Sequence, residues 1–232
     1  MSGGMLGSVF LAYVVLVAVV VAAVLRRHLP RRAAWMGLAW LLVWFAYAGA
    51  IGYSGILRDP SLRPPGIAIL VGPILISVVG WIGVGSFGRL LVSHIPLGVI
   101  LGLQSFRVGV EVVLHMLWQA GLLPHLMTLE GGNVEVIVAL TAPLAASMVM
   151  RGQRVRLVWA WNLAGLLSLM NVVARGVLTA PGPLNLIHAD VPNLATGQFP
   201  FSFIPGFMVP LALVLHVLAF QAMRSQLKPQ GV

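Results

Sequence analysis

The chain contains no cysteine, only five acidic residues and a single lysine among its 232 residues. The absence of cysteine excludes disulfide bonds, thiolate metal ligands and a cysteine nucleophile. The lysine, Lys228, lies outside any apolar segment, which excludes a retinal-binding rhodopsin of the usual kind. Walker loops, nucleophile elbows and dinucleotide fingerprints are also absent. No recognisable catalytic motif therefore assigns the chain to an enzyme class.

Charged residues make up only 8% of the chain, whereas hydrophobic residues make up 59% and the mean hydropathy is +1.00. Soluble domains carry about 25% charged residues, so the composition predicts an integral membrane protein. We expect an all-α polytopic membrane bundle of about seven transmembrane helices, with residues 1–232 forming a single integral-membrane domain. The predicted spans are residues 5–25, 33–57, 67–87, 97–123, 133–150, 157–178 and 203–223.

Basic residues are unevenly divided between the two ends of this predicted bundle. Ten lie in the first, third and fifth turns and the C-terminal tail: Arg26, Arg27, Arg31, Arg32, Arg89, Arg151, Arg154, Arg156, Arg224 and Lys228. Only Arg58 and Arg63 lie in connections on the other side. The positive-inside rule then predicts an outside N-terminus and a cytoplasmic C-terminus in the cytoplasmic (inner) membrane. The net charge of +9 thus reflects helix orientation in a lipid bilayer, and no nucleic-acid partner is expected.

A polar stripe runs along the fourth predicted span. Gln104, Arg107, Glu111 and His115 are three, four and four residues apart, which places them on one face of a helix at membrane depth. Arg107 and Glu111 lie one turn apart and can neutralise each other. Ionisable groups at this depth are functional candidates, although the stripe also fits a structural clamp between helices.

Other intramembrane polar residues extend the stripe into a predicted pocket. Asn171 and Arg175 lie one turn apart near the outer end of the sixth span, and His216 lies in the seventh. The predicted ligand-binding residues are Gln104, Arg107, Glu111, His115, Asn171, Arg175 and His216. Two intramembrane arginines against one intramembrane acid favour a small anionic or carboxylate-bearing ligand. Binding or transport of a small solute is therefore the leading hypothesis, with the oligomeric state left open.

A membrane-embedded metal-, haem- or quinone-binding redox protein or enzyme is the alternative hypothesis. Glu111, His115, Glu130 and His188 offer ligands for a metal at the outer end, but no HExxH motif fixes their spacing. His115 and His216 are expected to lie about 13 Å apart along the bundle axis, too far for one haem. The sequence therefore assigns no cofactor.

The longest connection, residues 179–202, is expected to lie outside and to fold over the mouth of the pocket. It has 24 residues, whereas connections in helical bundles usually have about two to eight. Its four prolines lower the entropy cost of ordering it, and disorder would leave side chains such as Leu184 and Phe199 exposed. A lid over a ligand and a passive cap over helix ends both fit these features.

From Gln104 onward the sequence resembles a group of uncharacterised bacterial multi-pass membrane proteins. The matching segments are Gln104-Ser105-Phe106-Arg107 with Glu111, Gly121-Leu122-Leu123-Pro124, Met127-Thr128, Glu130-Gly131 with Asn133, Leu140-Thr141-Ala142-Pro143, Trp161-Asn162 and Phe199-Pro200-Phe201. In that pattern an arginine follows the Glu-Gly pair and an aspartate closes it, where this chain has Gly132 and Glu135. The resemblance covers about the C-terminal half and implies no activity.

Overall fold

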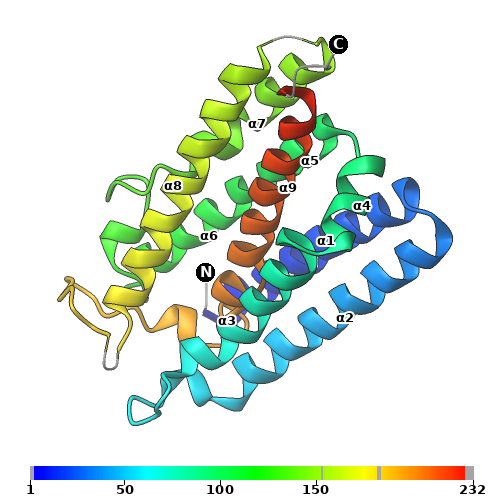
Figure 1. Ribbon diagram of the computed structural model, residues 1–232. Coiled ribbons are helices and arrows are strands. Elements are labelled where there is room, and N and C mark those ends of the chain that lie inside the picture. Colours follow the sequence, from blue (N-terminus) through cyan, green and yellow to red (C-terminus); the bar gives the residue numbers. More distant parts are fainter. Residues whose placement is uncertain (1–2, 153, 182–183, 228–232) are drawn as a thin grey trace.

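The computed structural model describes residues 3–152, 154–181 and 184–227, and every regular element within these ranges is helical. The α-helices are α1 (Gly3–His28), α2 (Arg31–Ser54), α3 (Gly66–Ser77), α4 (Ser86–His94), α5 (Leu97–Leu103), α6 (Arg107–Gln119), α7 (Glu135–Met150), α8 (Val155–Thr179) and α9 (Val209–Leu227). Figure 1 shows most of them running roughly along one common direction. The all-α helix bundle expected from the sequence is confirmed.

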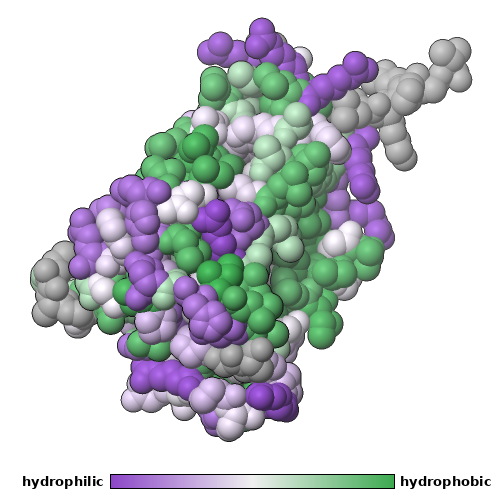
Figure 2. Space-filling model, turned by 90° about the vertical axis from the view of Figure 1, so that its left-hand side faces the viewer, coloured by the Kyte–Doolittle hydropathy of each residue, from purple (hydrophilic) through white to green (hydrophobic). Residues whose placement is uncertain are grey.

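Six helical segments of the described chain are long and apolar enough to cross a membrane. They are Gly4–His28, Arg31–Ser54, Gly66–Gly83, Leu97–Gln119, Val155–Thr179 and Ile204–Arg224. The predicted fifth span corresponds to α7, which has only 16 residues and is shorter than the roughly 20 that a typical span needs. Large apolar side chains such as Leu42 and Ile76 are exposed, and Figure 2 shows hydrophobic residues over much of the middle of one face. Such a surface suits contact with lipid.

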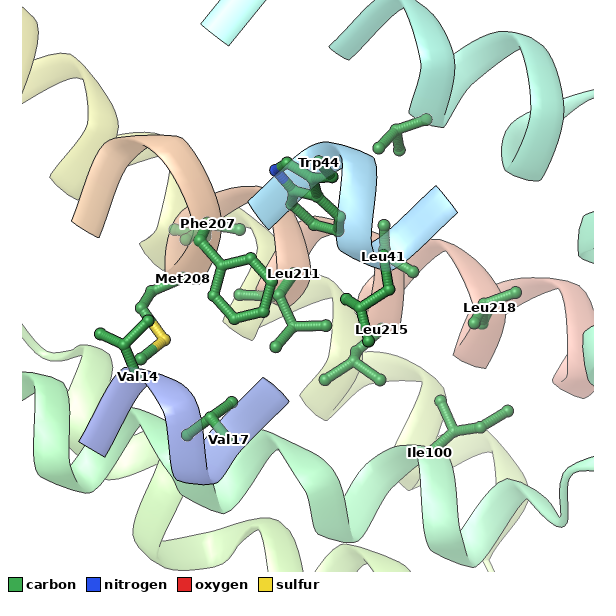
Figure 3. Packing of buried hydrophobic residues seen from close by; sticks show 14 of the residues in the cluster. Val14, Val17, Leu41, Trp44, Ile100, Phe207, Met208, Leu211, Leu215 and Leu218 are labelled. Atoms are coloured by element: carbon green, nitrogen blue, oxygen red, sulfur yellow. The ribbon is translucent and has the colours of Figure 1, made fainter. Parts of the chain in front are cut away.

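Helix α9 is the central element of the bundle. In the candidate span Ile204–Arg224, which includes most of α9, 72% of the residues in the most apolar stretch are buried, against 22–44% in the other five candidate spans. It contacts α4, α5 and α8 along its length, and Figure 3 shows Leu211 and Leu215 of α9 packed among side chains from α1, α2 and α5. The sequence gives α9 apolar residues on all sides, which is the pattern of a helix enclosed by others.

Several helices are interrupted within the bundle. A 3₁₀ turn, η3 (Gln104–Phe106), separates α5 from α6, and π-helical turns η2 (Val78–Gly83) and η6 (Ile204–Met208) follow α3 and precede α9. The Gln221 amide on α9 donates to the carbonyls of Ile82 and Gly83 at 3.0 and 2.8 Å. Carbonyls at the end of η2 are thus satisfied by a neighbouring helix, as backbone away from water requires.

The expected turn around Arg89 and His94 is wrong, because these residues lie in helix α4. This short helix buries Phe87 and Leu91 and leaves Arg89 and His94 outside the core, so it is amphipathic. It lies at the same end of the bundle as the α1–α2 and α7–α8 turns and the end of α9 (Figure 1). Nine of the ten basic residues assigned to that side, from Arg26 to Arg224, lie in the described ranges and gather at this end, whereas the tenth, Lys228, lies outside the described residues.

Candidate functional site

An ion pair between Arg107 and Glu135 lies at the centre of the polar residues. The guanidinium of Arg107, at the start of α6, donates to the Glu135 carboxylate in the first turn of α7. Arg107 is 4% exposed and Glu135 is 8% exposed. A carboxylate at a helix N-terminus is also favoured by the helix dipole. The expected pairing of Arg107 with Glu111 is therefore wrong: its partner is an acid that lies outside the predicted stripe.

His216 and Gln104 complete the surroundings of the Arg107 side chain. Arg107 Nη1 lies 3.2 Å from His216 Nε2 and 3.3 Å from Gln104 Oε1. On its other side, His216 Nδ1 lies 2.8 Å from Asn162 Oδ1, and the Asn162 amide donates to the His216 carbonyl at 3.1 Å. Because arginine only donates and an amide oxygen only accepts, His216 carries its proton on Nδ1. Three predicted residues, Gln104, Arg107 and His216, thus meet in one buried cluster.

A glycine on α8 makes room for this cluster. A Cβ atom on Gly165 would lie 2.7 Å from Cε1 of His216 and 3.0 Å from Cγ1 of Val138. Within the cluster, three buried atoms have no hydrogen-bond partner: Gln104 Nε2, Arg107 Nε and Glu135 Oε1. The cluster is therefore tightly enclosed but not fully satisfied, an arrangement that is uncommon in a purely structural network.

Glu111 is bound by the connection between α6 and α7. Its carboxylate accepts from the Leu129 backbone amide at 2.6 Å and from the Asn133 side chain at 3.3 Å. Asn133 also donates to the Met127 carbonyl at 2.9 Å and accepts from the Glu135 amide at 3.2 Å. Since Glu111 lies near the middle of the span Leu97–Gln119, this connection reaches into the bundle, where its backbone groups need protein partners.

Arg175 also holds this connection. Its Nη1 donates to the carbonyls of Leu126 and Gly131 at 2.8 Å each, and its Nε donates to Asn171 Oδ1 at 3.3 Å. A Cβ on Gly132 would lie 3.4 Å from the guanidinium, and its φ of +91° is one that glycine adopts without strain. Asn171 and Arg175 thus lie side by side as predicted, but they support the backbone of the connection.

His115 lies apart from the buried cluster. It is bonded to Gln119 at 2.9 Å, and its Nδ1 lies 3.4 Å from the half-exposed Glu130 carboxylate. The pKa of Glu130 lies below its ordinary value, chiefly because its own backbone amide donates to it, with smaller contributions from His115 and Thr128. His188 is exposed on another connection. In the described part of the chain no three His, Asp or Glu side chains are placed to hold a metal ion, so the Glu111, His115, Glu130 and His188 hypothesis gains no geometric support.

A cavity of about 560 Å³ lies beside Glu111, Arg107 and Glu135. Its walls come from α3, α6, α8, η6 and the start of α9, and most of the lining side chains are apolar. Residues of the long connection after α8, among them Leu194 and Gln198, also line it. The cavity therefore joins an apolar chamber to the polar cluster, with the long connection after α8 forming part of its wall.

Comparison with known proteins places most of this architecture in one family. Residues 64–224 match the family model described as a domain of unknown function, DUF8737. The chain belongs to the DUF8737 family. No curated protein and no solved structure matches the chain. The DUF8737 region begins just before α3 and ends in α9, so it contains the whole polar cluster and every cavity-lining residue except Leu57 and Arg58.

Helices α1 and α2 precede the DUF8737 region and contact it where its helices are interrupted. The Tyr13 hydroxyl on α1 donates to the Phe106 carbonyl in η3. On α2, the Trp44 indole donates to the Gly206 carbonyl in η6 at 2.7 Å. Aromatic donors of this kind satisfy carbonyls that an irregular helix leaves free.

Three residues of the site were not predicted from the stripe: Glu135, Asn133 and Asn162. Each lies on a helix or connection other than α5 and α6, so the helical periodicity of those two helices could not reveal it. All three nevertheless lie in segments that carry the family resemblance or close its pattern. The scarcity of acids was a usable signal for Glu135. An arginine at membrane depth needs an acidic partner, and the chain has only five acidic residues to supply one.

Proposed function

We propose that this protein binds a small, predominantly apolar molecule in the cavity beside Arg107 and Glu135. The observation that carries the proposal is the cavity itself, because about 560 Å³ lies within the usual range of ligand pockets, roughly 300–1,000 Å³. Apolar walls with a few polar groups at one end are also the usual composition of such pockets. A molecule with an apolar body and one polar end would match both parts.

The anionic ligand that the arginine count favours is not supported by these contacts. Arg107 is neutralised by Glu135, and Arg175 donates to two backbone carbonyls and to Asn171. Neither guanidinium is therefore free to bind an anion without giving up a buried partner. Replacing such a partner is costly unless the ligand supplies an equivalent charge and geometry.

Binding is better supported than transport through this conformation. Beyond the His216 cluster, toward the basic end, the buried residues of the described helices are apolar and include Leu97, Leu101, Val158 and Leu218. A continuous polar path to both ends, which a channel-like route would need, is absent among the described residues. Transport would require a second conformation in which this packing opens.

The membrane placement is part of the proposal. We place the protein in a bacterial cytoplasmic membrane with its N-terminus outside, because the basic ends of α1, α4, α7 and α9 lie together. The cavity then opens toward the outer side, below the connection between α8 and η6.

Photoaffinity labelling tests the proposed function. The purified protein in lipid nanodiscs is treated with a ten-carbon alcohol carrying a diazirine, and the labelled residues are located by mass spectrometry. We expect labels on cavity residues of α3 and α8, such as Val71 and Val173, that excess unlabelled decanol removes.

A matched pair of glycine variants locates the label. Gly72 lines the cavity and Gly80 does not, and a Cβ at either position meets no heavy atom within 4 Å. Gly72→Phe should fill the cavity and reduce saturable labelling by at least about fivefold, whereas Gly80→Phe should leave it unchanged. Saturable labelling that is equal in Gly72→Phe and wild type would reject the proposed site.

A further inference from the structure

Glu111 is a buried carboxylate for which no cationic partner is found among the described residues. Its residue is 8% exposed, and its two bonds come from a backbone amide and an asparagine side chain. His115, one turn further along α6, lies 3.4 Å from the exposed Glu130 carboxylate. Arg107, one turn away, is directed to Glu135.

The charges that line the cavity are unbalanced at its inner end. Four ionisable residues line it: Arg58, Arg107, Glu111 and Glu135. Arg58 is exposed in the connection before α3, where water and salt screen it. At the inner end, one arginine faces two carboxylates, and one carboxylate oxygen, Glu135 Oε1, has no hydrogen-bond partner.

We propose that the ligand of this cavity is an amphipathic cation whose ammonium group pairs with the Glu111 carboxylate. The proposal rests on the proposed function and assigns its ligand class. The apolar body lies along α3 and α8, and the ammonium donates to a carboxylate that is already held in place by Leu129 and Asn133. An isolated carboxylate is costly to bury, and a ligand cation removes that cost with a charge-assisted hydrogen bond.

The other ligand charges fit less well. A carboxylate-bearing ligand would add a third negative charge beside Glu111 and Glu135, which is repulsive in a site removed from water. A neutral alcohol could occupy the apolar walls but would leave Glu111 without a counter-charge. The structure therefore ranks ammonium above alcohol and alcohol above carboxylate for molecules with the same apolar chain.

Competition among three ten-carbon molecules tests this ranking. Decylamine, decanol and decanoate are used at pH 7 to displace the diazirine-bearing alcohol from wild-type protein. We expect decylamine to compete at least about tenfold better than decanol, and decanoate to compete worst. Because the molecules partition differently into the bilayer, each is compared between wild type and variant at the same total concentration.

Glu111→Gln is the decisive variant, since glutamine keeps an oxygen that can accept from the Leu129 amide. We expect it to abolish the preference for decylamine while decanol competes within about threefold of wild type. Glu111→Asp, which keeps the charge, should retain part of the preference, and Glu130→Gln, at an exposed acid outside the cavity, should retain all of it.

The outcomes separate the two proposals. Equal competition by decylamine and decanol in wild type, or a preference that survives in Glu111→Gln, overturns the cationic ligand but leaves the cavity as a binding site. Failure of all three molecules to displace the label overturns the proposed function as well. If Glu111→Gln does not fold, a reduced but not abolished preference in a folded Glu111→Asp protein supports the pairing, and an unchanged preference there opposes it.

Discussion

Replacing Glu135 by glutamine removes the carboxylate that neutralises Arg107 and leaves the shape of the side chain nearly unchanged. Arg107 is then a cation that is 4% exposed, with only the neutral Gln104 and His216 as side-chain partners. Breaking a buried ion pair from one side costs about 3–5 kcal/mol. Arginine cannot relieve this by losing its proton, so we expect Glu135→Gln to lower the free energy of unfolding by an amount in that range.

The assay is reversible unfolding in mixed micelles, followed by circular dichroism and repeated for a double-mutant cycle. Arg107→Met removes the unpaired cation, so Arg107→Met/Glu135→Gln should lose at least about 2 kcal/mol less than the sum of the two single variants. Glu130→Gln is the matched control, because Glu130 is an exposed acid in the same connection and should show no measurable loss. A loss below about 1 kcal/mol for Glu135→Gln, or additive single variants, would refute the buried pair as a stabilising unit.

Two further predictions concern the outer side of the protein. A C-terminal green fluorescent protein fusion should fluoresce, and alkaline phosphatase inserted at residue 190 should be active. The reason is that the positive-inside rule places the C-terminus in the cytoplasm and residue 190 outside. The reverse pattern would show that the topology is inverted. Replacing residues 184–198 by a short Gly/Ser linker should reduce saturable labelling several-fold in a folded protein, because Leu184, Leu194 and Gln198 line the cavity. Loss of stability alone would instead indicate a passive cap, and no effect on either property would contradict both roles.

Hydropathy was sufficient to predict the class and the approximate position of the long helices. A span of apolar residues is a local property, and the spans predicted around residues 5–25, 157–178 and 203–223 agree closely with α1, α8 and the segment Ile204–Arg224, which joins η6 to α9. The same criterion was wrong at α4, where low hydropathy around polar residues at the edge of the core indicated a turn. The segment is a helix that buries Phe87 and Leu91 on one face. An amphipathic helix at the end of a bundle is visible in its periodicity rather than in its mean hydropathy.

The partners of the polar residues could not be predicted in the same way. Periodicity correctly aligned Gln104 and Arg107, but the order of base before acid in Arg107 and Glu111 was already unfavourable for an intrahelical pair. The actual partner, Glu135, is the first residue of α7. It reaches Arg107 because the connection between α6 and α7 brings the start of α7 beside the start of α6. This is a tertiary arrangement, and one sequence gives no direct signal for it.

Irregular backbone inside the bundle explains why several intramembrane polar residues were assigned to a ligand. The connection between α6 and α7 brings amides and carbonyls against the helices of the bundle, and Glu111, Asn133 and Arg175 bond to its backbone. A donor such as Arg175 therefore looks the same in the sequence whether it serves a ligand or a buried carbonyl. The sequence hypotheses of a pocket and of a structural clamp need not exclude each other, because Glu111 both binds this backbone and lines the cavity.

This double role decides which substitution is informative about function. Arg107→Gln breaks the ion pair with Glu135, so a loss of binding in that variant would follow from damage to the fold as readily as from a lost ligand contact. Glu111→Gln removes a charge that has no cationic side-chain partner among the described residues and keeps an acceptor for the Leu129 amide. Its effect on binding can be separated from its effect on stability, because replacing an unpaired buried carboxylate by a neutral amide should not destabilise the bundle by more than about 1 kcal/mol. A change in ligand charge preference at unchanged stability is therefore a result that only a direct role of Glu111 in the cavity produces.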